Sequence, residues 1–117
     1  MKMKTGFGWI EIGDHRYDHD IIIHTDGTVT KRKKKLSKPM KEEFGHTPLS
    51  HEELAVLKDE GPEIIYIGTG QYGDLPLTPE AEELLESFHS VLRPTPDILP
   101  EIEGERKKFL AIIHVTC

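Results

Sequence analysis

A glycine-rich loop near the middle of the chain could bind an anion through its main-chain amides. Gly68, Gly70 and Gly73 come directly after residues 63–67, which read Glu-Ile-Ile-Tyr-Ile. Such an apolar run is typical of a buried strand, and α/β proteins commonly place ligands where a strand delivers its loop. N–H groups exposed in a glycine-containing turn form a concavity that suits negative charge. We therefore expect an anion site at the amides of residues 69–71.

The same glycines fit the spacing Gly-x-Gly-x-x-Gly, but the residues around them argue against a dinucleotide site. That fingerprint requires the helix to begin within the motif, so that its first amides meet the pyrophosphate. Here the predicted helix begins only at Thr78, and the next predicted strand ends in Arg93 and Pro94 without an acidic residue for a ribose. We predict no cofactor. The alternative role of the glycines is to permit positive φ in a tight connection.

Cys117 and His114 suggest a thiol nucleophile with a histidine base. If both lie on one extended strand, residues three positions apart point to opposite faces, so the two side chains do not form a local pair. The carboxylate of the last residue also disfavours a thiolate beside it. We therefore predict no catalytic residue and expect Cys117 to be a small, buried apolar side chain. His46, in a long loop, is a second histidine that could reach this region.

Residues 14–20, Asp-His-Arg-Tyr-Asp-His-Asp, are rich in metal-ligating side chains. In a strand, Asp18 and Asp20 share one face and His19 takes the other, so the donors do not converge. No further cysteine or histidine pattern completes a tetrahedral set. We predict no metal site, and we interpret the segment as the surface of a hairpin whose apolar side chains, such as Ile21, face a core.

The charge of the chain is unevenly distributed. The net charge is −6, yet one stretch without acidic residues is strongly basic. Its basic residues are Lys31, Arg32, Lys33, Lys34, Lys35, Lys38 and Lys41. An acidic chain with no aromatic residues among these lysines is a poor partner for nucleic acids, so we predict no nucleic-acid binding. We interpret the stretch as a solvated loop that could hold a phosphate or an acidic partner locally.

Length and composition predict a single domain spanning residues 1–117. No run approaches the ~18 apolar residues needed to span a bilayer, and the first residues lack a signal-peptide pattern. The one cysteine excludes an intrachain disulfide, as is usual in a reducing compartment. We expect a cytoplasmic protein that is a monomer or weak dimer and does not insert into a membrane.

Turn residues and apolar alternation predict β structure in the first third of the chain. The expected strands are residues 7–12, 17–24 and 28 onward, with Gly13-Asp14 and Asp26-Gly27 in the turns. Residues 36–48 are expected to form a loop. A helix then begins with a capping box, in which Ser50 is the N-cap and Glu53 the third helical residue.

The rest of the chain alternates between strands and helices. The expected elements are a strand over 63–67, a helix over 78–88, a strand over 89–93, a short helix after Pro96 and a strand over 109–116. Thr78 as N-cap and Pro79 at the first helical position suit the start of the second helix. The apolar strands show little alternation, which indicates that helices cover both faces of an α/β sheet.

Several short motifs, taken in order, resemble those of a known family. They are Tyr17-x-x-Asp20-x-Ile22-Ile23, His46-Thr47-Pro48, Ile65-Tyr66-Ile67-Gly68-Thr69-Gly70 and the closing His114-Val115-Thr116-Cys117. Together they resemble a small domain of unknown function. This domain is shared by uncharacterised archaeal and bacterial proteins, including a methanogen member of known fold, by the mammalian adipogenesis-associated domain protein and by a mitochondrial assembly factor for respiratory complex I.

The resemblance runs over essentially the whole chain and carries expectations about fold and function. It implies a three-layer α/β fold with a mixed central sheet, an N-terminal β-hairpin element, helices on both faces and a surface cleft near the glycine loop. It implies no settled activity. One departure from the family is Pro100, which predicts a short or broken helix before the last strand.

Two functional classes follow from these observations. The first, which we favour, is a non-enzymatic interaction or assembly module with an unknown protein partner. The second is a protein that binds a small anionic ligand, or an enzyme, in which basic residues such as Arg32 or Lys33 hold the anion and His46 or His114 handles a proton. The candidate ligand-binding residues are Arg32, His46, Gly68, Thr69, Gly70, Gln71, His114 and Cys117.

Overall fold

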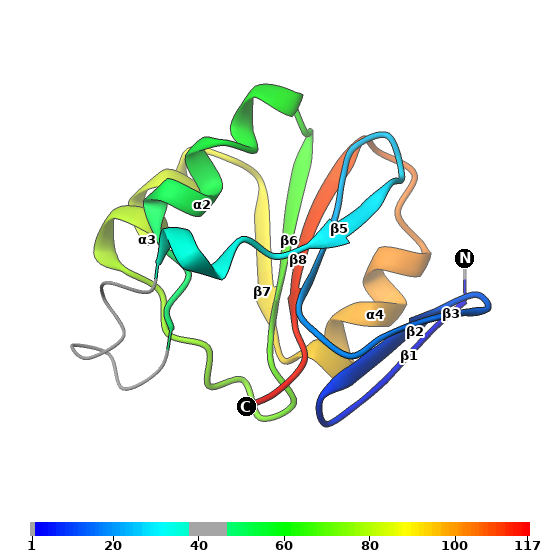
Figure 1. The fold of residues 1–117 in the computed structure, drawn as a ribbon. Helices are drawn as coiled ribbons and strands as arrows, with labels where there is room; N and C mark the ends of the chain where they lie inside the picture. Colours follow the sequence, from blue (N-terminus) through cyan, green and yellow to red (C-terminus); the bar gives the residue numbers. More distant parts are fainter. Residues whose placement is uncertain (1, 38–46) are drawn as a thin grey trace.

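A five-stranded mixed sheet forms the centre of the protein (Figure 1). The computed structural model describes residues 2–37 and 47–117. The strands, in spatial order, are β5 (Val29–Lys31), β4 (Ile21–Ile23), β8 (Phe109–His114), β6 (Ile64–Thr69) and β7 (Ser90–Arg93). β6 runs parallel to both of its neighbours, whereas β4 runs antiparallel to β8 and β5. The mixed central sheet and the interior position of the strand predicted at 63–67 are therefore confirmed.

The first strands form a separate three-stranded antiparallel sheet, β1 (Met3–Gly6), β2 (Trp9–Ile12) and β3 (His15–Tyr17). The predicted turn at Gly13-Asp14 is confirmed, because it connects β2 to β3. The sequence did not reveal β1, so the N-terminal element has one strand more than the predicted hairpin.

The single strand expected over 17–24 is wrong, because the chain changes sheets within it. β3 ends at Tyr17, and β4 begins at Ile21 in the central sheet. Asp20, just before β4, is buried and forms hydrogen bonds with residues of two other segments, Arg32 after β5 and the consecutive residues His114 and Val115 at the end of β8. These tertiary contacts hold the chain where local β propensity alone predicts an uninterrupted strand.

Helices cover both faces of the central sheet, as predicted, and create three layers (Figure 1). α4 (Thr95–Glu103) and the small sheet lie on one face, and α2 (His51–Ala55) and α3 (Pro79–Glu86) lie on the other. The first face buries Met3, Ile10, Ile21, Ile23, Ile64, Tyr66, Ile98, Leu99, Ile102, Ala111, Ile113 and Val115. The second buries Ile22, Leu49, Leu54, Leu57, Ile65, Ile67, Leu75, Ala81, Leu85, Leu110 and Ile112. Alternate residues of β4, β6 and β8 thus enter opposite cores.

The two predicted helix starts have different outcomes. Thr78 caps α3 as expected, because its Oγ1 accepts a 3.2 Å hydrogen bond from the amide of Ala81. Ser50 does occupy the N-cap position of α2, but its side chain makes no capping bond. The predicted capping box is therefore wrong: Glu53 instead accepts charged hydrogen bonds from buried Arg32, which are stronger than a bond to a helix-end amide.

α4 is short, at nine residues, as one of the two predicted outcomes required, but it continues through Pro100 without the predicted break. A proline inside a helix costs about 3 kcal/mol. Ile98, Leu99 and Ile102 of this helix are buried, and each such side chain contributes roughly 1.5–3 kcal/mol. Burial of the apolar face therefore outweighs the lost hydrogen bond.

No helix within 2–37 and 47–117 is long and apolar enough to cross a membrane.

Candidate functional site

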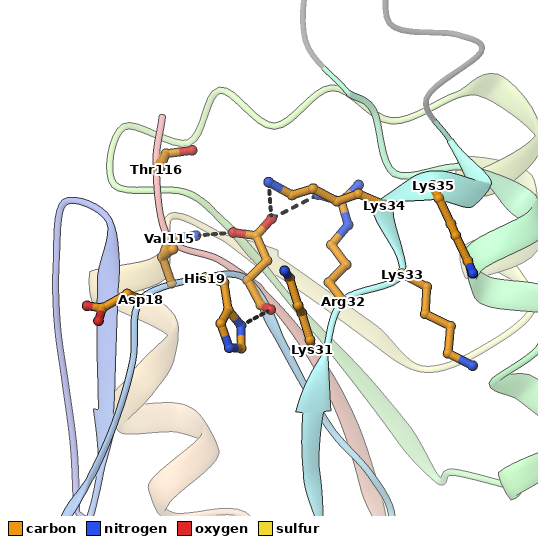
Figure 2. Close-up of a pocket in the computed structure, with 10 residues that line it drawn as sticks. Asp18, His19, Lys31, Arg32, Lys33, Lys34, Lys35, Val115 and Thr116 are labelled. Atoms are coloured by element: carbon orange, nitrogen blue, oxygen red, sulfur yellow. Dashed lines mark hydrogen bonds and ion pairs between the residues drawn. The ribbon is translucent and has the colours of Figure 1, made fainter.

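A cavity of about 540 Å³ opens at the edge of the central sheet where β8 ends (Figure 2). β6 is parallel to β8, so this is also the edge at which β6 delivers the glycine loop. The lining residues are Asp18, His19, Asp20, Lys31, Arg32, Lys33, Lys34, Lys35, Val115 and Thr116. They come from the segment before β4, from the last residue of β5 and the segment after it, and from the residues after β8. The carboxyl ends of parallel strands are the usual ligand-binding edge of an open α/β sheet.

Asp20 lies at the centre of the site and connects all three segments. Its Oδ1 accepts a 2.8 Å hydrogen bond from the amide of Val115. Its Oδ2 lies 3.0 Å from Nη1 of Arg32, 2.8 Å from Nδ1 of His114 and 3.5 Å from Nζ of Lys34. Burial by itself raises the pKa of Asp20, but the hydrogen bonds and positive charges around the carboxylate hold the pKa well below its usual range. Asp20 is therefore ionised at neutral pH.

Arg32 is buried behind the cavity wall, although the sequence placed it in a solvated loop or against a ligand. Its Nε and Nη2 each donate a 2.8 Å hydrogen bond to Glu53, and Nη2 also donates to the carbonyl of Pro48. Nη1 donates to Asp20. Burial lowers the pKa of Arg32, but the two carboxylates outweigh it and raise the pKa above its usual value. The guanidinium is thus committed to contacts inside the protein.

A set of hydroxyl contacts completes the buried group around Glu53. Ser37 donates to the Glu53 carboxylate, and the hydroxyls of Ser37 and Ser50 lie 2.7 Å apart. In the part of the chain that the structure describes, every buried side-chain nitrogen or oxygen has a hydrogen-bond partner. Two carboxylates, one guanidinium and two hydroxyls therefore tie the end of β5 to the start of α2.

Lysines form the exposed wall of the cavity. Lys31, Lys33 and Lys35 are exposed, and Lys34 is partly exposed. Figure 2 shows Lys34 extending back over Arg32, whereas Lys33 and Lys35 point away from Thr116. The prediction of a wholly solvated basic loop is correct for Lys31, Lys33 and Lys35 but wrong for Arg32, which is buried, and for Lys34, which pairs with buried Asp20. Lys38, Lys41 and His46 lie outside the described residues.

His114 lies between Asp20 and Thr116. Its Nδ1 is 2.8 Å from Oδ2 of Asp20, and its Nε2 is 3.1 Å from Oγ1 of Thr116. An ionised carboxylate only accepts hydrogen bonds, so Nδ1 carries a proton. In neutral imidazole Nε2 then accepts the hydroxyl proton of Thr116. His114 is thus oriented by one neighbour and hydrogen-bonded to a hydroxyl that lines the cavity.

The glycine loop does not line this cavity, and two of its amides already have partners in the protein. The amide of Gly70 donates to Oγ1 of Thr95 at 3.0 Å, and the amide of Gln71 donates to the carbonyl of Thr116 at 2.7 Å. The final segment of the chain thus occupies the face of the loop where the sequence predicted an anion. Thr69 is buried, and Gly68 packs closely against Thr95.

Gly70 is required by its conformation and its contact. Its φ is +102°, and a Cβ at this position would lie 2.3 Å from the carbonyl carbon of Cys117. The alternative that we gave for the glycines, a positive φ in a tight connection, therefore applies at Gly70.

Cys117 does not pair with His114 and is not fully buried, contrary to our expectation of a buried side chain. It follows β8, and its side chain is partly exposed. Its main-chain oxygen accepts hydrogen bonds from the amides of Tyr72 and Asp74, at 3.2 and 2.9 Å. The residue therefore anchors the end of the sequence to the glycine loop through its backbone.

The acidic and histidine-rich segment at residues 14–20 does not assemble a metal site. Within residues 2–37 and 47–117, no group of three or more histidine, cysteine, aspartate or glutamate side chains is placed to hold a metal ion. His19 contacts the main-chain oxygen of Asp20 through Nδ1 at 2.9 Å. The interpretation of this segment as a hairpin surface fails at Asp20, which is buried.

Sequence reasoning missed several residues of the site. Asp20, Lys34, Glu53 and Thr116 were not proposed as parts of one site, although each was noted or lies in a noted motif. The available signal was an acidic residue directly before the apolar run Ile21–Ile23, where an unpaired carboxylate would be costly to bury. That signal indicates a partner but does not say which basic residue supplies it.

Comparison with known structures places the chain in a family. It is 37% identical over its whole length to the conserved hypothetical protein PH1505 from Pyrococcus horikoshii OT3, whose whole length is also covered, with a TM-score of 0.87. The chain belongs to the family of PH1505. A second solved structure, MT938, is 32% identical to the chain over 97% of the chain and 96% of its own length, with a TM-score of 0.78.

A more distant structure shares only the fold of the PH1505 family. It is a Bordetella parapertussis protein solved by the Northeast Structural Genomics Consortium, 19% identical over 94% of this chain and 90% of its own, with a TM-score of 0.53. No family model and no curated protein matches the chain. The structural relatives are uncharacterised, so they support the fold and carry no activity to this site.

Proposed function

We propose that the protein binds a small anionic ligand, carrying carboxylate or phosphate groups, in the lysine-walled cavity. The observation that carries this proposal is the lining itself: Lys31, Lys33, Lys34 and Lys35 line one side of a cavity of about 540 Å³. That volume lies within the range of small-molecule sites, roughly 300–1,000 Å³.

The charge balance of the cavity supports an anion. The buried carboxylates of Asp20 and Glu53 are balanced by two positive charges, the guanidinium of Arg32 and the ammonium of Lys34. Asp18 is then the one other acidic side chain among the residues that line the cavity. The lysines thus have an excess of positive charge in a protein whose net charge is −6, which favours a local anion over a long nucleic acid.

An NMR titration with succinate and with inorganic phosphate tests the proposal. We expect shifts of the amide signals of residues 31–35 and 115–116, and weaker binding at higher salt. Replacing Lys33 and Lys35 by glutamate should weaken binding at least about tenfold, which corresponds to about 1.4 kcal/mol.

The matched control replaces Arg106 and Lys107 by glutamate, because both are exposed and do not line the cavity. It makes the same change in net charge and should retain binding. If both double variants bind equally well, or if neither probe shifts the cavity residues, the anionic ligand is the wrong function.

A second candidate is the interaction or assembly module that the sequence favoured, by analogy with the complex I assembly factor and the adipogenesis-associated protein. One observation favours it: Phe7 and Tyr72 are 57% and 71% exposed, and their ring centroids lie 6.1 Å apart. Exposed aromatic pairs are typical anchors of protein interfaces. For this candidate, a partner identified by cross-linking should be lost from the Phe7→Ser, Tyr72→Ser variant and retained by a Leu92→Ser variant.

A further inference from the structure

We propose that Thr116, His114 and Asp20 form a hydrolytic triad, in which the Thr116 hydroxyl attacks an ester whose acyl group carries a negative charge. This inference rests on the proposed anionic-ligand function, because the lysines of the cavity would select the charged acyl group. It adds a reaction to a binding site.

The three side chains are hydrogen-bonded in the order hydroxyl, imidazole, carboxylate, which is the arrangement of an activated nucleophile. A hydroxyl lies 3.1 Å from Nε2 of His114, and the opposite ring nitrogen lies 2.8 Å from the Asp20 carboxylate. A nucleophile within hydrogen-bond reach of a base, with the base oriented by a third group, is the signature of nucleophilic catalysis. The ionised Asp20 keeps the proton on Nδ1, so Nε2 is free to accept the proton of Thr116.

One carboxylate fixes the whole arrangement. Oδ2 of Asp20 orients the ring of His114, while Oδ1 accepts a hydrogen bond from the amide of Val115, the residue between the base and the nucleophile. The carbonyl of His114 also accepts a 2.6 Å hydrogen bond from Thr95. These two hydrogen bonds fix the backbone between His114 and Thr116, so the hydroxyl and the imidazole are positioned before a substrate binds.

The nucleophile is accessible, whereas the base is protected. Thr116 lines the cavity and is partly exposed (Figure 2). The His114 side chain is only 12% exposed and lies behind it. The Lys34 ammonium, 3.5 Å from Asp20, enters the same cavity and supplies positive charge for the developing oxyanion.

The reaction balances without a cofactor. Thr116 Oγ1 bonds to the ester carbonyl carbon while its proton passes to Nε2 of His114, and the ester C–O bond breaks as the leaving alcohol takes that proton. Water then bonds to the acyl carbon, gives its proton to Nε2, and the bond to Oγ1 breaks as the threonine recovers a proton. The products are an alcohol and a carboxylic acid, and no group is oxidised or reduced.

The test compares mono-4-nitrophenyl succinate with neutral 4-nitrophenyl acetate by release of 4-nitrophenolate, using the intact chain. We expect faster release from the anionic ester, with a succinyl group found on Thr116 by mass spectrometry of the quenched reaction. Thr116→Val and His114→Gln should each lower the rate by about 10²–10⁴-fold. Thr116→Ser, which keeps the hydroxyl, should retain activity, and His89→Gln, at an exposed site away from the cavity, should leave the rate unchanged.

The outcomes separate the reaction from binding. If succinate binds but Thr116→Val retains the wild-type rate, or if the succinyl group lies on a lysine, the triad is overturned while the anionic-ligand function stands. If succinate and the ester show no contact with the cavity, the binding function itself is overturned. Thr116→Val keeps the shape of threonine without its hydroxyl, whereas Thr116→Ser keeps the hydroxyl, so the comparison of these two variants holds even if His114→Gln fails to fold.

Discussion

Arg32, directly after β5, donates two hydrogen bonds, each 2.8 Å long, to Glu53 in α2. The same guanidinium reaches Asp20 before β4 and the carbonyl of Pro48 before α2. One side chain therefore joins the edge of the sheet to a helix and to the wall of the cavity.

Replacing Arg32 by methionine should lower the free energy of unfolding by about 3–5 kcal/mol, because Asp20 and Glu53 would be left buried without their positive partner. Urea unfolding followed by circular dichroism measures the change. Arg16→Met is the control, since Arg16 pairs with Asp18 at 3.0 Å on the surface, where such a pair contributes about 0–1 kcal/mol. Equal losses in the two variants would contradict a dominant role for the buried pair.

Asp20 should make stability depend on pH in the acid range. Its folded-state pKa is lowered from a usual value near 3.9, so the unfolded chain binds the proton first as the pH falls. The contribution is present above about pH 4 and is lost on acidification towards the folded-state pKa. The unfolding free energy of Asp20→Asn should therefore decline less between pH 5 and pH 2 than that of the wild type, as urea titrations at each pH would measure.

Asp18→Asn is the control for this pH dependence, because the Asp18 side chain is exposed. It should retain the wild-type slope of unfolding free energy against pH. A wild-type slope in Asp20→Asn as well would show that other carboxylates, such as Glu60, account for the acid sensitivity.

Gly70→Ala should cost stability for two reasons, the φ of +102° and the close approach of the Cys117 main chain. Gly27→Ala isolates the first reason, since Gly27 has a φ of +88° and nothing within 4 Å of the added carbon. We expect Gly27→Ala to cost about 1–3 kcal/mol and Gly70→Ala to cost more. Thermal and urea unfolding of both variants provide the measurement, and equal costs would mean that the final segment moves aside freely.

Ile67→Ala should lower the unfolding free energy by about 2–5 kcal/mol, because Ile67 is fully buried in the central strand β6. Val56→Ala is the control, as Val56 is 57% exposed, and should change stability by less than about 0.5 kcal/mol. Chemical denaturation measures both variants. A small effect at Ile67 would argue that the core repacks around the lost side chain.

Local patterns predicted much of the fold. The apolar run at Ile65 and Ile67 identified a buried interior strand, and Thr78 identified the start of α3. These features depend on periodicity, burial and capping among neighbours in sequence. The candidate site was less predictable, because its central contact joins Asp20 and His114, which are 94 positions apart.

The sequence by itself determined that this is an α/β protein with apolar strands, a glycine connection after β6 and a basic segment after β5, since each is a property of consecutive residues. Only the tertiary structure decided which charged side chains are buried and paired inside the protein. Arg32 is buried while its neighbours Lys31 and Lys33 are exposed. Glu53 accepts hydrogen bonds from Arg32 and does not take part in the predicted capping box. The physical reason is that a buried charge requires an opposite charge in contact. Which residue supplies that charge depends on which distant segments the fold brings together, and a local sequence pattern does not contain this information.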